Sequence, residues 1–83
     1  MNNNLVSSDI KPGFVFGEKN KWFAVVIKVY FVYEDVSFKN KRCDICCFST
    51  TLNGQMNQNK RVDTIFELII SLNPMFFIKV LDE

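Results

Sequence analysis

The sequence contains no histidine, and it has only three glycines and two prolines. Histidine is the commonest general base and a frequent zinc ligand, so its absence excludes Ser–His and Cys–His nucleophile pairs. The glycines, at positions 13, 17 and 54, are too far apart to form a phosphate-binding loop. The carboxylates are scattered as well, and their spacing does not indicate a catalytic pair. We therefore expect no enzymatic activity, no catalytic residue and no cofactor.

Cysteine is also scarce: the three thiols are Cys43, Cys46 and Cys47. An odd, tightly clustered set is a poor disulfide framework and fits reduced thiols. A structural zinc site needs four ligands, and on a strand Cys46 and Cys47 would point to opposite faces. We expect small side chains packing in a sheet rather than a metal site.

The chain lacks a strong excess of either charge, since ten basic and nine acidic residues give a net charge of +1. Proteins that mainly bind duplex nucleic acid usually carry a larger positive excess. No secretory signal is recognisable, and the longest apolar run, residues 22–33, is interrupted by Lys28. A membrane span needs about 20 apolar residues. We expect a cytoplasmic protein that does not bind membranes.

What the chain does have is apolar mass: 48% of its residues are hydrophobic, and nine are phenylalanine. This composition is typical of a folded protein, and 83 residues suffice for one domain. The polar start suggests a flexible segment at residues 1–9, followed by a single domain at residues 10–83.

Alternation of apolar residues predicts strands at residues 14–16, 22–33, 43–50 and 75–81, with a further short strand around Val36 and Phe38. The strand at 22–33 is the strongest. Its wholly apolar face is expected to lie in the core and comprises Phe23, Val25, Ile27, Val29, Phe31 and Tyr33. The opposite face is mixed and comprises Trp22, Ala24, Val26, Lys28, Tyr30 and Val32.

Residues 51–61 are polar and contain Asn-Gly, which indicates a loop. A helix is predicted at residues 64–72, where Thr64 and Glu67 fit a capping box and Pro74 follows the end. Its expected core stripe is Ile65, Leu68, Ile69 and Leu72. The fold class is thus α+β: a small, curled, mostly antiparallel sheet of four to five strands with one helix, in the order β-β-(β)-β-α-β. The element order is compatible with an SH3-like barrel.

Two surfaces are candidates for binding a protein partner. Trp22, Lys28 and Tyr30 lie on the mixed face of the long strand and combine aromatic rings with a cation, as interface hot spots do. The helix is apolar nearly all round, so Phe66 and Ile70, with the neighbouring Phe77, are expected at a homodimer or target interface.

Two basic segments support a different hypothesis. Lys39, Lys41 and Arg42 form one cluster, and Lys60 and Arg61 form another. Combined with stacking on Trp22 and Tyr30, they would suit single-stranded nucleic acid.

Near-neutral charge, surplus apolar surface and missing catalytic groups favour a non-enzymatic protein-binding module. Small proteins of this kind are often encoded by phages or other mobile elements, where they inhibit a host protein machine, as anti-CRISPR-type proteins do. The single-stranded nucleic-acid-binding small barrel is the alternative.

Overall fold

The computed structural model describes residues 5–54, 57–72 and 75–78, with only the backbone described at residues 53 and 75–78. Five strands and one α-helix make up this part of the chain: β1 (Val15–Glu18), β2 (Trp22–Val36), β3 (Lys39–Thr50), β4 (Asn57–Arg61), α1 (Val62–Ser71) and β5 (Met75–Ile78). Two short 3-10 turns, η1 (Ser7–Asp9) and η2 (Leu52–Gly54), complete it.

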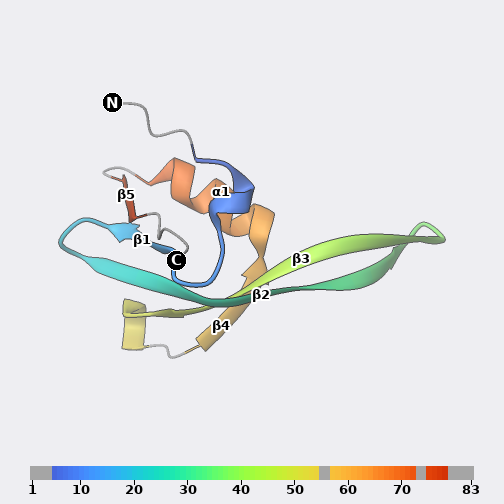
Figure 1. Cartoon of the computed structure of the whole chain (residues 1–83), viewed down its shortest axis with the longest axis horizontal. Helices are drawn as coiled ribbons and strands as arrows, with labels where there is room; N and C mark the ends of the chain where they lie inside the picture. The colour runs from blue at the N-terminus through green and yellow to red at the C-terminus, as the bar shows by residue number, and fades with distance from the viewer. Residues whose placement is uncertain (1–4, 55–56, 73–74, 79–83) are drawn as a thin grey trace.

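The strands form one antiparallel sheet in the order β4-β3-β2-β1-β5, and α1 lies over one face of it (Figure 1). This arrangement confirms an α+β fold with a mostly antiparallel sheet. The sheet is open, because the order of the described strands leaves β4 and β5 at opposite edges. The closure expected of an SH3-like barrel is therefore not seen in the described part of the chain.

The core lies between α1 and the sheet. We call the face of the sheet that is turned toward α1 the inner face, and the opposite face the outer face. Phe16, Val26 and Cys46 are fully buried on the strands, and Ile65 and Ile69 meet them from the helix. Phe16 also contacts the rings of Phe14 and Phe48, at centroid distances of 6.1 and 5.9 Å. Burying a side chain of this size contributes about 2 kcal/mol, so these few residues supply much of the stability of a small domain.

The core face of β2 was predicted wrongly, and a β-bulge is the reason. Before the bulge, the buried residues are Ala24 and Val26, whereas Phe23 is 48% exposed. The register with β3 shifts between Val26 and Lys28, which leaves Ile27 as the extra residue. A bulge reverses the alternation of faces, so Val29 follows Val26 on the inner face. Trp22 thereby lies on the inner face, whereas Lys28 and Tyr30 lie on the outer face.

Residues 57–61 were expected to be a loop, but they form β4, which pairs with β3 from Ile45 to Ser49. The five residues of β4 are all polar and mostly exposed, so the strand carries no apolar alternation that sequence patterns could detect. Polar, lysine-bearing strands are typical of sheet edges.

The helix begins earlier than predicted, because β4 runs directly into it. Its N-cap is Arg61 in an extended conformation, without a side-chain capping bond, so the proposed capping box of Thr64 and Glu67 is not formed. The buried stripe is Val62, Ile65 and Ile69, whereas Leu68 is 39% exposed. The last predicted strand is confirmed over Met75–Ile78, and residues 79–81 lie outside the described residues.

Within the described ranges, no helix has the length and apolar character needed to cross a membrane.

Candidate functional site: a projecting hairpin arm

The most conspicuous feature of the molecule is a two-stranded arm, defined as β2 from Lys28 to Val36, β3 from Lys39 to Cys47, and the turn between them. It extends to one side of the helix-covered sheet (Figure 1). The arm projects because its neighbours stop short. β1 pairs with β2 only over residues 22–25, and β4 reaches only to Ile45 on β3. From Tyr33 to Arg42, no residue of the arm is buried.

The tip of the arm is a two-residue turn, Ser37–Phe38, between the paired residues Val36 and Lys39. Both turn residues have positive φ, 52° and 66°, as tight hairpin turns of type I′ require. The short strand predicted around Val36 and Phe38 is therefore wrong: Val36 ends β2, and Phe38 belongs to the turn. The Phe38 side chain is fully exposed, at 106% of its reference area.

On the inner side, the arm carries an exposed aromatic cluster. The rings of Phe31 and Tyr33 meet edge-on at 5.7 Å, and they are 49% and 63% exposed. The Arg42 guanidinium lies 4.3 Å from the Phe31 ring centroid, and its Nε donates to Asp44 Oδ1 at 3.1 Å. Of these three contacts, the one between Arg42 and Phe31 joins β3 to β2.

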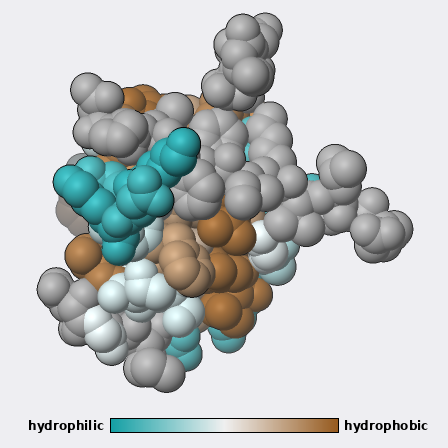
Figure 2. All heavy atoms as spheres, turned by 90° about the vertical axis from the view of Figure 1, so that its left-hand side faces the viewer, coloured by the Kyte–Doolittle hydropathy of each residue, from teal (hydrophilic) through white to brown (hydrophobic). Residues whose placement is uncertain are grey.

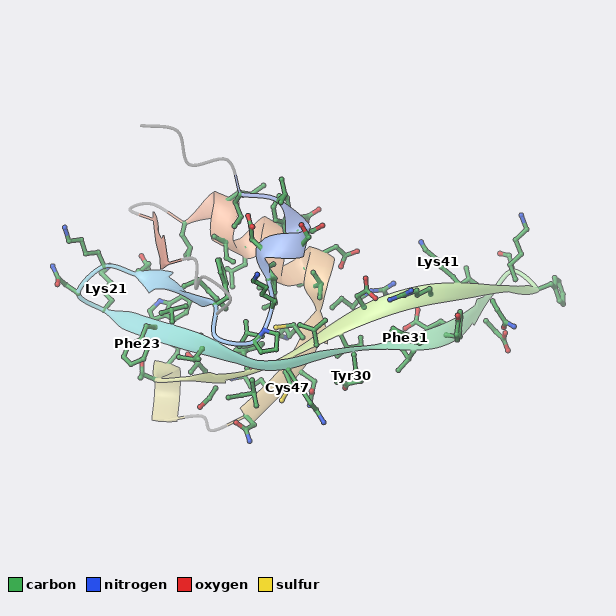
Figure 3. The ribbon with its side chains drawn as sticks, in the orientation of Figure 1. Lys21, Phe23, Tyr30, Phe31, Lys41 and Cys47 are labelled. Carbon is green, nitrogen blue, oxygen red and sulfur yellow. The ribbon has the colours of Figure 1, made fainter. Side chains whose placement is uncertain are left out.

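The outer side of the arm carries Lys28 and Tyr30. Figure 3 shows Phe23, Tyr30 and Cys47 on the side of the sheet away from α1. The Tyr30 hydroxyl donates to Asn59 Oδ1 at 3.3 Å, and Lys28 Nζ lies 5.5 Å from the Tyr30 ring centroid. Lys28 and Tyr30 thus share a surface as predicted.

Trp22 does not belong to that surface. The bulge at Ile27 leaves it on the inner face, where its ring meets Phe16 edge-on at 6.1 Å and its Nε1 donates to Glu18 Oε1 at 3.0 Å. It also lines, with Phe23, a groove at the end of the molecule away from the arm. Figure 2 looks onto this end and shows hydrophilic and hydrophobic atoms side by side.

The helix residues proposed for an interface have different environments. Phe66 is half-buried against the core, whereas Ile70 is 55% exposed. The side chain of Phe77, in β5, lies outside the described residues. Among the side chains that the structure describes, the exposed apolar part of this predicted helix surface is Ile70 with its neighbour Leu68.

The two basic clusters meet in part. Lys41, Arg42 and Arg61 line one shallow groove of about 190 Å³ between the arm and the start of α1, together with Asp44 and Asp63. Arg61 Nη2 lies 3.6 Å from Glu34 Oε1, and its Nε lies 4.0 Å from Asp63 Oδ1. Lys39 and Lys60 are exposed but do not line this groove. The two arginines of this groove are therefore already paired with carboxylates.

The three cysteines are free. Cys46 is completely buried in the core. This burial is the main reason why the pKa of its thiol is raised to about 11, and the charge of the neighbouring Cys47 adds a smaller effect in the same direction. Cys43 accepts a hydrogen bond from Arg61 Nη2 at 2.8 Å. Burial and a hydrogen bond with Glu34 raise the pKa of the Cys43 thiol, against the lowering effect of Arg61. Cys43 and Cys46 are thus buried packing residues of the sheet, whereas Cys47 is half-buried.

Sequence reasoning missed the arm because it assigned the exposed aromatic residues to other places. Phe31 and Tyr33 were placed in the core, and Phe38 in a strand. The turn has no Gly, Asn or Asp at its two central positions, so the usual hairpin signal is missing. The signal in the sequence was length: the strand predicted at residues 22–33 is already long, and β2 extends it to 15 residues, too many for a core of this size to cover.

Comparison of the chain with protein-family models, with curated proteins and with solved structures finds no match.

Proposed function

We propose that this protein is a non-enzymatic binding module that docks onto another protein through the tip of its arm, with Phe38 as the anchor. The observation that carries the proposal is the fully exposed Phe38 side chain, held in a left-handed backbone conformation at the end of a projecting hairpin. A bulky residue is rarely found in this conformation, because it is strained there. Such strain is characteristic of binding sites.

The surroundings of Phe38 suit insertion into a partner. Val36 precedes the turn and is 48% exposed, and Tyr33 further along β2 is 63% exposed. Aromatic anchors that fill a pocket supply most of the affinity in many protein interfaces. The arm presents its anchor already ordered, through the cross-strand pairs and the Arg42–Phe31 contact, so little conformational entropy is lost on binding. A hydrophobic pocket on a protein surface is the partner chemistry that fits.

For the biological setting, we propose that the partner is a host protein machine and that the module inhibits it by occupying a surface, as phage and mobile-element proteins do. This part of the proposal is supported by size, composition and the missing catalytic groups.

The alternative, binding of single-stranded nucleic acid, has less support. Trp22 packs toward the core, and Arg42 and Arg61 form ion pairs with Asp44 and Glu34. Phosphates would have to displace these carboxylates. This alternative requires an affinity that falls steeply with added salt.

Photo-crosslinking in the cell of origin tests the proposed function. A benzoylphenylalanine at position 38 is expected to give one discrete protein adduct, identified by mass spectrometry. The same amino acid at position 52 is the matched control, because Leu52 is also exposed, at 45%, but lies in η2, away from the arm. Adducts with nucleic acid only, or the same adducts at both positions, would contradict a role for the tip.

A further inference from the structure

The two long edges of the arm are chemically different. From Lys28 onward, β2 has no strand partner on its β1 side among the described residues. β3 is equally unpaired from Lys39 to Asp44 on its β4 side, but there it carries Lys39, Lys41 and Arg42. Lysine and other charged residues protect exposed edges against pairing. The β2 edge carries neither charge nor proline from Val29 to Tyr33, so it is the edge open to another strand.

The sequence of this open edge is complementary to itself. Read from residue 28 to residue 34 it is Lys-Val-Tyr-Phe-Val-Tyr-Glu, with Phe31 at the centre. We propose that two copies of the chain pair antiparallel through this segment of β2, about a two-fold axis beside Phe31. Lys28 of each copy then lies opposite Glu34 of the other, Val29 opposite Tyr33, and Tyr30 opposite Val32.

Each of these pairs is a favourable cross-strand combination. Opposite charges meet at both ends, and an aromatic ring meets a β-branched side chain at four positions between them. The two Phe31 side chains meet at the axis. The pairing also covers exposed apolar surface, since Phe31, Val32 and Tyr33 are 49%, 37% and 63% exposed.

The neighbouring structure selects this register. Two-fold symmetry requires that residues opposite each other lie on the same face, so the axis must pass beside a residue. An axis beside Val32 would place Glu34 opposite Tyr30. An axis beside Tyr30 would place Glu34 opposite Val26, whose N–H and C=O already bond to Phe14 O and Gly13 N at 2.9 Å. Only the axis beside Phe31 uses the open edge and pairs both charges.

The pairing is expected to be weak and concentration-dependent, because seven residues a side is fewer than the 20–30 of a typical stable interface. The ion pair of Glu34 with Arg61 within one chain does not prevent it. The Arg61 and Glu34 side chains are 3.6 Å apart and are 43% and 41% exposed, so their ion pair is weak.

Cysteine crosslinking tests the register directly. In the full chain carrying Cys47→Ser, which removes the most accessible native thiol, Phe31→Cys places a new thiol opposite its own copy. Paired strands bring such residues to a Cα–Cα distance of about 5 Å, within the range of a disulfide. Oxidised glutathione is expected to convert this variant to a covalent dimer, with two thiols oxidised and the glutathione disulfide reduced.

The matched controls are Val29→Cys and Tyr33→Cys in the same background. Each alone is expected to remain monomeric, because residue 29 faces residue 33, whereas a mixture of the two is expected to crosslink. Failure of Phe31→Cys to crosslink, or equal crosslinking of all three variants alone, would overturn the proposal.

Analytical ultracentrifugation with charge variants gives a second, independent readout. Lys28→Glu and Glu34→Lys are each expected to raise the dissociation constant of the dimer at least tenfold, because like charges then meet at both ends. A mixture of the two variants is expected to form a heterodimer, because every end again carries opposite charges. Lys39→Glu, on the β3 edge, is the control and should leave the dissociation constant unchanged.

A wild-type chain that is a strict monomer at millimolar concentration would overturn the proposal, and so would a dimer lost on Ile70→Lys but insensitive to Lys28→Glu. Either result would leave the proposed function of the tip unaffected, because Phe38 lies outside the paired segment.

Discussion

At the scale of single residues, Phe38 and Cys46 represent the two kinds of apolar side chain in this protein, those exposed on the surface and those buried in the core. Cys46 is completely buried and contributes to the core, whereas Phe38 is completely exposed and has a backbone conformation that opposes folding. Both residues lead to predictions that need no knowledge of a partner.

Replacing Phe38 by Asn is expected to stabilise the protein. Asn tolerates positive φ far better than Phe and is favoured in two-residue hairpin turns, so the free energy of unfolding should rise by about 1 kcal/mol. Urea denaturation measures this change. Tyr33→Asn is the control, because Tyr33 is also an exposed aromatic residue but lies in a regular strand, so this substitution should not stabilise the protein. A loss of stability in Phe38→Asn would show that the ring contributes to the fold.

Cys46 predicts a loss of stability at alkaline pH. Its thiol has a pKa of about 11 in the folded protein and an ordinary value of 9.0, so between these values the unfolded state binds fewer protons. The contribution of Cys46 is therefore fully present below pH 9 and is lost as the pH rises to about 11. The loss amounts to about 3 kcal/mol.

The measurement is the free energy of unfolding from pH 8 to 11, with Cys46→Ala as the comparison. Every other titratable side chain is present in both proteins, so the difference between the two curves isolates the Cys46 thiol. Parallel curves would mean that Cys46 ionises as easily in the folded protein as in the unfolded one.

At the scale of elements, β2 shows how far sequence patterns reach. β2 itself, its strong apolar character and the helix α1 were predictable, because periodicity and length depend on local residues. The faces of β2 were not predictable, because the bulge at Ile27 depends on the register with β3, a long-range property. β4 was missed for a related reason, since its polar residues form a strand only because β3 offers an edge.

The candidate site was predictable only in fragments. Lys28 and Tyr30 were correctly placed on one face of β2. Phe31 and Tyr33 were misassigned because apolar alternation normally indicates burial, and nothing local reveals that β1 and β4 end before the arm does.

Deletion of Ile27 is expected to be tolerated, although it removes a residue from the middle of a strand. Ile27 is the extra residue of the bulge, so its removal leaves Val26 opposite Phe48 and Lys28 opposite Cys47. The free energy of unfolding should change by less than about 1 kcal/mol.

Deletion of Val29 is the matched control and should be severe. Without Val29, the extra residue of the bulge would be needed to fill the register, so Lys28 would move opposite the buried Cys46. An unpaired charge at that position costs several kcal/mol. Thermal denaturation of the two deletion variants distinguishes these outcomes, and equal losses would mean that the bulge is not the source of the register shift.

At the scale of the whole molecule, the arm makes the protein elongated. The radius of gyration is 13.6 Å and the principal extents are 44 × 32 × 29 Å, whereas a compact chain of 83 residues has a radius of about 12 Å. The helix-covered sheet thus holds the core, whereas the outer part of the arm, from Tyr33 to Arg42, contains no buried residue.

Shortening the arm is therefore expected to leave the fold intact. Replacing residues 33–42 by Asn-Gly keeps the pair of Val32 and Cys43 and closes it with a favourable turn. None of the ten replaced residues is buried, so the free energy of unfolding should fall by no more than about 2 kcal/mol. Urea denaturation checks stability, and small-angle scattering checks that the radius of gyration decreases. An unfolded variant would show that the arm is part of the folding unit.

The unequal edges of the arm also limit how large an assembly can become. Once two β2 edges have met, both outward edges of the joined ribbon are β3 strands bearing Lys39, Lys41 and Arg42. A third chain could add only by pairing its β2 edge with one of these positively charged β3 edges. Charged edges disfavour such pairing, so we expect association to end at two copies. In the proposed dimer, the open β2 edge of each copy is thereby covered by the other copy.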